Sequence, residues 1–130
     1  MHSLQVRTGV REAMIDITPK LQDLLEADGP LSGIMTVYTP HTTTGLTINE
    51  GADPDVCRDI LTHLRTLVPQ HPGFRHTEGN SDAHIKASIF GSSVQIIIDE
   101  GRLVLGTWQR VFLGEFDGPR TRTLLVKILT

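Results

Sequence analysis

The sequence predicts an α+β fold that is mostly β, because extended apolar runs outnumber helical stretches. Two segments carry helix signals, whereas eight others are alternating or continuously apolar runs of four to nine residues, which is typical of strands. The last strands are apolar on both faces, as in Leu124–Val126 and Ile128–Leu129. Such strands need cover on both sides, from a second sheet or from a neighbouring subunit. We therefore expect an oligomer interface.

The first part of the chain predicts a helix set among strands. Thr18 is a suitable N-cap and Pro19 a suitable first helical residue, and the turn sequence 28–30 (Asp-Gly-Pro) ends that helix. The strands of this part are expected at residues 4–10, 12–17, 33–38 and 46–50.

A second helix is predicted from Asp53 to Val68, with Pro54 at its first position and Pro69 as its stop. At about 100° per residue its apolar side chains share one arc of roughly 140°. They are Val56, Cys57, Ile60, Leu61, Leu64, Leu67 and Val68. The helix should therefore lie on a core, with Cys57 as a small buried side chain rather than a nucleophile.

Residues 69–84 read as a long loop rich in Pro, Gly, Asn and Ser, and long loops in small domains are usually functional or disordered. The remaining strands are expected at residues 93–98, 102–105, 108–116 and 122–129. Their connections at 99–101 and 117–120 have typical turn sequences.

Length and charge narrow the class of protein. A chain of 130 residues with 38% apolar residues should form a single domain over residues 1–130. Its net charge of −3 disfavours nucleic-acid binding, which needs clustered cations, and its one cysteine excludes an intramolecular disulfide. No apolar run approaches the ~18 residues of a membrane span, and the start lacks a secretory signal. We expect a cytoplasmic protein that does not enter a membrane.

Three of the six histidines, His41, His76 and His84, lie in polar or glycine-containing segments. Three imidazoles with one open position would suit zinc or a similar divalent metal. The spacing between His76 and His84 matches no common local metal motif, so ordinary loop hydrogen bonds are the alternative. His2, His63 and His71 carry no such signal.

Glu50 ends an alternating run and lies on its apolar face. It is either solvated at the strand end or buried with a partner, and burial would raise its pKa and suit it to general acid–base catalysis.

The only Trp lies in the segment 106–109, Gly-Thr-Trp-Gln. Trp108 is either a core or interface anchor, or it forms a pocket wall together with the Gln109 amide, which could hydrogen-bond a heterocycle.

These residues belong to blocks that resemble the YjbQ-like family, which is also labelled secondary thiamine-phosphate synthase. The most specific block combines Ser93, Ile96, Ile98 and Gly101 with residues 106–109 and Val111. The further matching blocks are residues 41–43, 45–50, 53–56, 75–76, 82–88 and 91–93. The match runs in order over roughly residues 35 to 130. The chain departs from the family pattern at 79–82, which leaves the role of Asp82 open.

The resemblance implies a small two-sheet β-sandwich with two or three helices that assembles as a homotrimer. It implies one pocket, near a subunit boundary, with His41, His76 and His84 as metal ligands and Glu50 as acid or base. Trp108 and Gln109 become pocket residues. The expected cofactor is a divalent metal, zinc or similar, or magnesium if a pyrophosphate substrate is native. The expected partners are a small-molecule substrate and other copies of the chain.

The label secondary thiamine-phosphate synthase fits a metal site made of three histidines poorly. Joining a thiazole phosphate to a pyrimidine pyrophosphate calls for magnesium held by oxygen ligands and several cations, and the sequence lacks a glycine-rich phosphate cradle. We therefore expect thiamine-phosphate synthesis to be secondary and another small-molecule reaction to be native. The alternative is a non-catalytic trimer that binds a small ligand or a metal.

Overall fold

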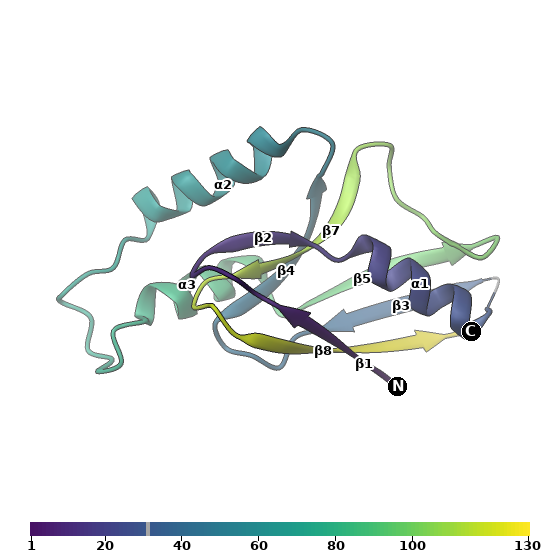
Figure 1. Cartoon of the computed structure of the whole chain (residues 1–130), viewed down its shortest axis with the longest axis horizontal. Helices are drawn as coiled ribbons and strands as arrows, with labels where there is room; N and C mark the ends of the chain where they lie inside the picture. The colour runs from purple at the N-terminus through teal and green to yellow at the C-terminus, as the bar shows by residue number, and fades with distance from the viewer. Residues whose placement is uncertain (31) are drawn as a thin grey trace.

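The computed structural model describes residues 1–30 and 32–130 and contains, in that part of the chain, two antiparallel sheets and three helices (Figure 1). The larger sheet has the strand order β1 (His2–Arg7), β8 (Thr121–Leu129), β3 (Gly33–Tyr38), β5 (Ser93–Asp99) and β6 (Arg102–Leu103). The smaller sheet has the order β2 (Ala13–Asp16), β7 (Gln109–Glu115) and β4 (Thr44–Glu50). The helices are α1 (Thr18–Asp28), α2 (Pro54–Leu67) and α3 (Ser81–Phe90). The predicted α+β class and the two-sheet architecture are confirmed.

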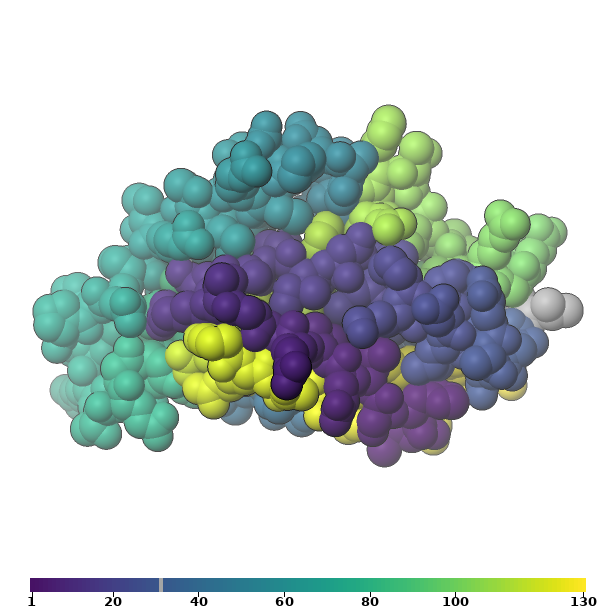
Figure 2. Space-filling model, viewed as in Figure 1, coloured from purple at the N-terminus to yellow at the C-terminus, as the bar shows by residue number. Residues whose placement is uncertain are grey.

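The main core lies between the two sheets and under α1. Both sheets and the helix contribute fully buried side chains, among them Met35, Leu113, Leu124 and Leu21. In the space-filling view, β1 and α1, coloured purple to blue, cover much of the viewed face (Figure 2). The burial of this apolar surface is the main driving force for the two-sheet arrangement.

Helix α1 begins one residue earlier than the sequence suggests. The N-cap is Ile17, and Thr18 is already helical. The hydroxyl of Thr18 instead accepts a hydrogen bond from the Val111 N–H at 2.7 Å and so ties the helix start to β7. Gly29, with φ of 84°, ends the helix in the left-handed conformation that glycine adopts without strain.

Helix α2 has the predicted caps but less burial than its sequence predicts. Asp53 accepts a hydrogen bond from the Asp55 N–H at 2.9 Å, as an N-cap should. Of the apolar arc, only Leu64 and Val68 are buried, Cys57 is half-buried, and Leu67 is 62% exposed. Burial raises the pKa of the Cys57 thiol, which agrees with an unreactive side chain.

Helix α3 corrects the prediction of a loop over residues 69–84, because the helix begins at Ser81 and continues to Phe90. Its pattern is inverted, which hides it from a search for amphipathic periodicity. Asp82 and Lys86 are buried, whereas Ile85 and Ile89 are 38% and 55% exposed. The inner face therefore combines these two charged residues with the small apolar side chains of Ala83 and Ala87, which weakens the apolar stripe expected of a surface helix.

A pair of glycines sets the position of α3 against the smaller sheet. Gly45 of β4 pairs with Gly114 of β7, and the Phe90 ring lies over both. A Cβ atom at Gly45 would lie 2.4 Å from the Phe90 Cβ, and one at Gly114 would lie 2.8 Å from the Phe90 ring. Glycine at both positions is thus what lets the helix approach the strands so closely.

The outer face of the larger sheet is exposed within one chain and carries an apolar patch among polar side chains. The exposed large apolar side chains are Ile34, Tyr38, Ile97 and Leu129, at 43% to 61% exposure, and Gln95 and Lys127 lie among them. The homotrimer, which would cover this face, stays a prediction. Among the described residues, none of the helices combines the length and apolar character that crossing a membrane requires.

Candidate functional site

His41 and His84 both line one polar cleft of about 300 Å³, which we call the histidine cleft. His41 follows β3 in the connection to β4, and His84 projects from the second turn of α3. The other polar residues that line the cleft are Thr42, Thr43, Glu78, Asn80, Asp117, Arg120 and Arg122. Residues more than 80 positions apart in the sequence therefore meet at this end of the fold.

The His41 ring is held by the backbone of β8. Its Nε2 accepts a hydrogen bond from the Thr123 N–H at 2.9 Å. Burial lowers the pKa of His41, and the nearby Arg122 guanidinium lowers it further. The imidazole is thus neutral at neutral pH, and because Nε2 is an acceptor, the proton is on Nδ1. His41 can donate from Nδ1, but using Nε2 for a metal would break its bond to Thr123.

His76 lies beside His84, but the three histidines do not come together as the predicted metal site requires. The two rings are in edge-to-face contact with centroids 5.3 Å apart, and His76 lies near Glu78, with 3.8 Å between His76 Nε2 and a Glu78 carboxylate oxygen. Within residues 1–30 and 32–130, no three side chains of the His, Cys, Asp and Glu types come together as a metal-binding group. The metal site stays a prediction that this single chain does not assemble.

A buried ion pair between Glu115 and Arg122 supports the floor of the cleft. The Arg122 Nε donates to Glu115 at 2.9 Å and its Nη2 donates to Glu115 at 2.5 Å and to the Thr43 hydroxyl at 2.8 Å. Burial alone would raise the pKa of Glu115, but hydrogen bonds from Arg122, Thr8 and the Asp117 N–H outweigh it and the pKa is lowered. The side chains are 0% and 3% exposed, so the pair is fully desolvated.

This pair was missed from sequence, although a signal for it exists. Glu115 and Arg122 are charged residues next to the apolar stretches 111–113 and 124–126, and they flank the predicted turn at 117–120. A charge in a doubly covered strand is rare unless it is paired.

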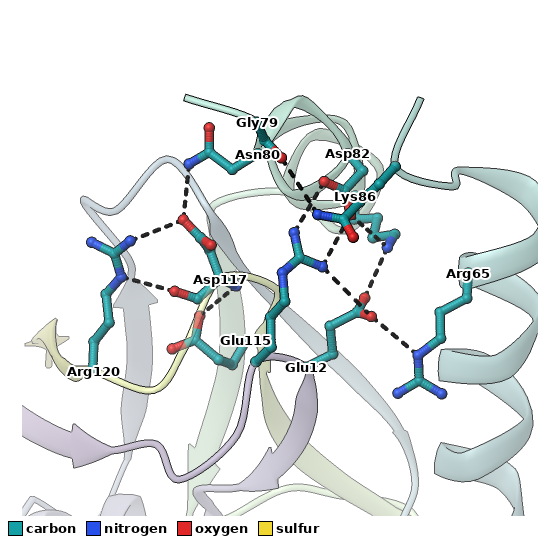
Figure 3. A network of polar contacts seen from close by, with 11 residues as sticks. Glu12, Arg65, Gly79, Asn80, Asp82, Lys86, Glu115, Asp117 and Arg120 are labelled. Carbon is teal, nitrogen blue, oxygen red and sulfur yellow. Dashed lines mark hydrogen bonds and ion pairs between the residues drawn. The ribbon is translucent and has the colours of Figure 1, made fainter. Parts of the chain in front are cut away.

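Among the described residues, Asn80 carries the one buried side-chain polar atom that has no hydrogen-bond partner. As the N-cap of α3 it makes no side-chain capping bond, and its Nδ2 instead donates to Asp117 at 2.8 Å (Figure 3). The atom without a partner is its Oδ1. Leaving such an acceptor unpaired costs roughly 1–3 kcal/mol. Asn80 also lines the histidine cleft, but this oxygen is itself shielded from solvent.

Glu50, Trp108 and Gln109 gather at the other end of the smaller sheet. Glu50 of β4 pairs directly with Gln109 of β7, and the Trp108 carbonyl accepts a hydrogen bond from the Gly51 N–H. The Glu50 carboxylate accepts from the Ala52 N–H at 2.6 Å. Glu50 is half-buried and closes the turn into α2. This position corresponds to the alternative in which Glu50 lies at the end of the strand.

Trp108 is 62% exposed, so it is not a core anchor of the single chain. Gln109 is also exposed, and its Oε1 accepts a hydrogen bond from the Gly106 N–H at 2.8 Å. The indole is thereby presented on a short closed loop, as an interface or pocket residue would be.

Asp82, which the departure from the family pattern leaves uncertain, does not line the histidine cleft. It is 1% exposed and bound to Arg11 and Lys86 on the other side of α3. It belongs to a separate cluster of charges.

The sequence model for the "UPF0047 protein YjbQ-like" family matches residues 2–130. A UPF0047 protein of Methanocaldococcus jannaschii is 50% identical over 125 residues, which cover 96% of this chain and 91% of that protein. The UPF0047 protein YugU of Bacillus subtilis is 48% identical, with 99% and 98% coverage.

Solved structures agree with these sequence matches. A yjbQ/UPF0047 family protein of Clostridium acetobutylicum superimposes with a TM-score of 0.96 at 49% identity, covering 99% of this chain and all of that one. A conserved hypothetical protein of Thermus thermophilus superimposes with a TM-score of 0.93 at 45% identity, with 99% and 100% coverage.

Proposed function

Because this chain belongs to the YjbQ-like UPF0047 family and carries two histidines on one polar cleft, we propose that it is an enzyme that binds a small polar molecule in the histidine cleft and transfers a proton at it. The observation that carries the proposal is the placement of two histidines, His41 and His84, on one polar cleft. An imidazole on a cleft wall is the group that most often exchanges a proton with a bound molecule near neutral pH.

The remaining cleft residues favour an oxygen acceptor on the same substrate. His41 has its proton on Nδ1, and the Nη1 groups of Arg120 and Arg122 have no hydrogen bond assigned among the described residues. A carbonyl or phosphoryl oxygen can accept from donors of this kind.

His84 is the group best suited to move the proton. It is half-buried on the cleft wall, and imidazole is the side chain that most often transfers protons near neutral pH. His41, whose Nε2 is occupied, instead positions the substrate.

Glu50, Trp108 and Gln109 can join this site only from a second copy of the chain. Thr44 and Glu50 are the two ends of β4, and six residue steps of ~3.3 Å separate them by ~20 Å. We therefore propose that the homotrimer, paired through the exposed outer face of the larger sheet, completes each pocket across a subunit boundary.

Thiamine-phosphate synthesis is proposed as a secondary activity of this cleft. A pyrophosphate leaving group needs several free cations, whereas Arg120 is bound to Asp117 and Arg122 to Glu115. Turnover of the thiazole phosphate and pyrimidine pyrophosphate near ~10 s⁻¹ at micromolar substrate would instead make it the native reaction.

Replacing His84 tests the proposed role in proton transfer, with the thiazole and pyrimidine pair as probe substrates. We expect His84→Asn to lower their turnover by ~10²-fold or more, since a lost general acid–base group typically costs that much. His63→Asn is the matched control, because His63 is an exposed histidine on α2. Equal turnover in wild type and His84→Asn would contradict the proposal.

A non-catalytic metal-binding or ligand-binding trimer is the second candidate, and the contact between His76 and His84 favours it. Elemental analysis of purified protein should then find stoichiometric zinc or a similar metal that is lost in His84→Asn. Glu50→Gln separates the two candidates further, since a binder keeps its ligand affinity whereas an enzyme loses turnover.

A further inference from the structure

On the side of α3 away from the histidine cleft, charged side chains surround a second hollow of about 220 Å³. We call them the lysine cluster, and its members are Arg11, Glu12, Arg65, Asp82 and Lys86. Pro69 and Gln70 complete the lining, and the hollow shares no residue with the histidine cleft. Figure 3 shows the cluster beneath α3, beside but separate from the group of Asn80, Asp117 and Arg120.

Lys86 lies at the centre of this cluster and is almost completely buried, with 2% of its side chain exposed. Its Nζ donates to Glu12 at 2.8 Å and to Asp82 at 3.2 Å. An ammonium group withdrawn from water to this extent is tolerated only with such partners.

All four carboxylate oxygens of the cluster are engaged by cations. Arg11 binds both oxygens of Asp82, at 3.2 and 3.1 Å. The Arg65 Nε donates to Glu12 Oε1 at 3.1 Å, and Lys86 binds Glu12 Oε2. Burial would raise the pKa of Asp82, but the bonds from Arg11 and Lys86 lower it, so this carboxylate stays ionised.

The cations of the lysine cluster outnumber its carboxylates, so one positive charge is not neutralised and some N–H donors have no acceptor in the described part of the chain. Three positive and two negative side chains leave a net charge of 3 − 2 = +1. Lys86 has three N–H donors and two bonds, and the Nη groups of Arg65 make no hydrogen bond to the described residues. These donors can each take a further acceptor.

We propose that this hollow binds a small oxyanion, a phosphate or a carboxylate group, between Arg11, Arg65 and Lys86. Arg11 and Arg65 are 34% and 52% exposed and admit the anion from solvent, and Lys86 lies at the inner end. Planar guanidinium groups suit both kinds of anion, and the partial burial of the site strengthens each contact. The site is distinct from the proposed catalytic cleft and does not depend on it.

The test is a thermal-shift and calorimetric titration of the full chain with inorganic phosphate, sulfate and acetate, with sodium chloride at equal ionic strength as the reference. We expect saturable binding of phosphate or acetate with a Kd of ~1 mM or tighter, together with a rise in Tm that follows occupancy. The tighter of the two identifies the group that the site selects.

Arg65→Gln should weaken this binding at least fivefold and still fold, because Arg65 is half exposed. Arg58→Gln is the matched control, since Arg58 is on the same helix and is 74% exposed. Among the described residues its side chain is hydrogen-bonded only to Asp55. Unchanged affinity in Arg58→Gln supports the site.

Three results would overturn the proposal. They are the absence of saturable binding in the wild type, an equal loss in Arg65→Gln and Arg58→Gln, and a loss in His84→Asn, which would place the anion in the histidine cleft. The first two leave the proposed proton transfer untouched, so the two proposals can fail separately.

Discussion

The two sides of α3 differ in how they hold buried charge. On the histidine side, Glu115 and Arg122 form one isolated pair that is fully withdrawn from water. On the lysine side, Asp82 and Lys86 are equally buried, but two arginines connect them to solvent. His84 and Lys86 are two residues apart, so their directions differ by about 200° around the helix. One short helix therefore separates a fully buried ion pair from a charge network that reaches solvent.

Breaking the isolated pair should have the largest effect. Glu115→Gln leaves the Arg122 charge buried without a counter-ion, and we expect a loss of ~3–5 kcal/mol in the free energy of unfolding. Urea denaturation measures it. Asp55→Asn, which removes the exposed partner of Arg58, is the control and should cost less than ~1 kcal/mol. A loss in Glu115→Gln as small as in the control would show that the buried Arg122 does not depend on this counter-ion.

Breaking the network should cost less. Lys86→Met removes two hydrogen bonds, but Arg11 still binds Asp82 and Arg65 still binds Glu12, so we expect a loss of ~1–3 kcal/mol. The same urea experiment compares it with Glu115→Gln. If Lys86→Met is the more destabilising of the two, the contrast between the sides is reversed.

The smallest expected effect is on how the free energy of unfolding changes with pH under acidic conditions. The pKa of Asp82 is lowered in the folded state, so the unfolded chain binds this proton first as the pH falls. The stabilisation is complete above about pH 5 and is lost as the pH falls below about 4. Asp82→Asn should reduce the slope of stability between pH 5 and pH 3 by at most ~1.4 kcal/mol per pH unit. An unchanged slope would mean that Asp82 titrates alike in the folded and unfolded states.

Local signals located most elements of the fold. The strand at Gly33–Tyr38 and the caps of α2 agree with the sequence prediction, because turn residues and proline act on their immediate neighbours. Helix α3 was missed because its inner face holds Asp82 and Lys86, which only a folded partner surface can neutralise.

The candidate residues divide in the same way. The sequence and the family resemblance singled out His41, His84, Glu50 and Trp108, but neither could show that Glu50 lies at the end of β4 away from His41. That separation is a matter of strand length and register, which depend on pairing with β7.

By itself the sequence determined the class, most of the strands, two of the helices and the family, because periodicity, caps and spaced motifs are written in short stretches of chain. Only the tertiary structure decided which charges meet. The histidine cleft joins residues 41, 80, 84, 117 and 122, and the lysine cluster joins residues 11, 12, 65, 82 and 86. Such contacts depend on the desolvation and distance of groups far apart in the chain, which no local pattern encodes.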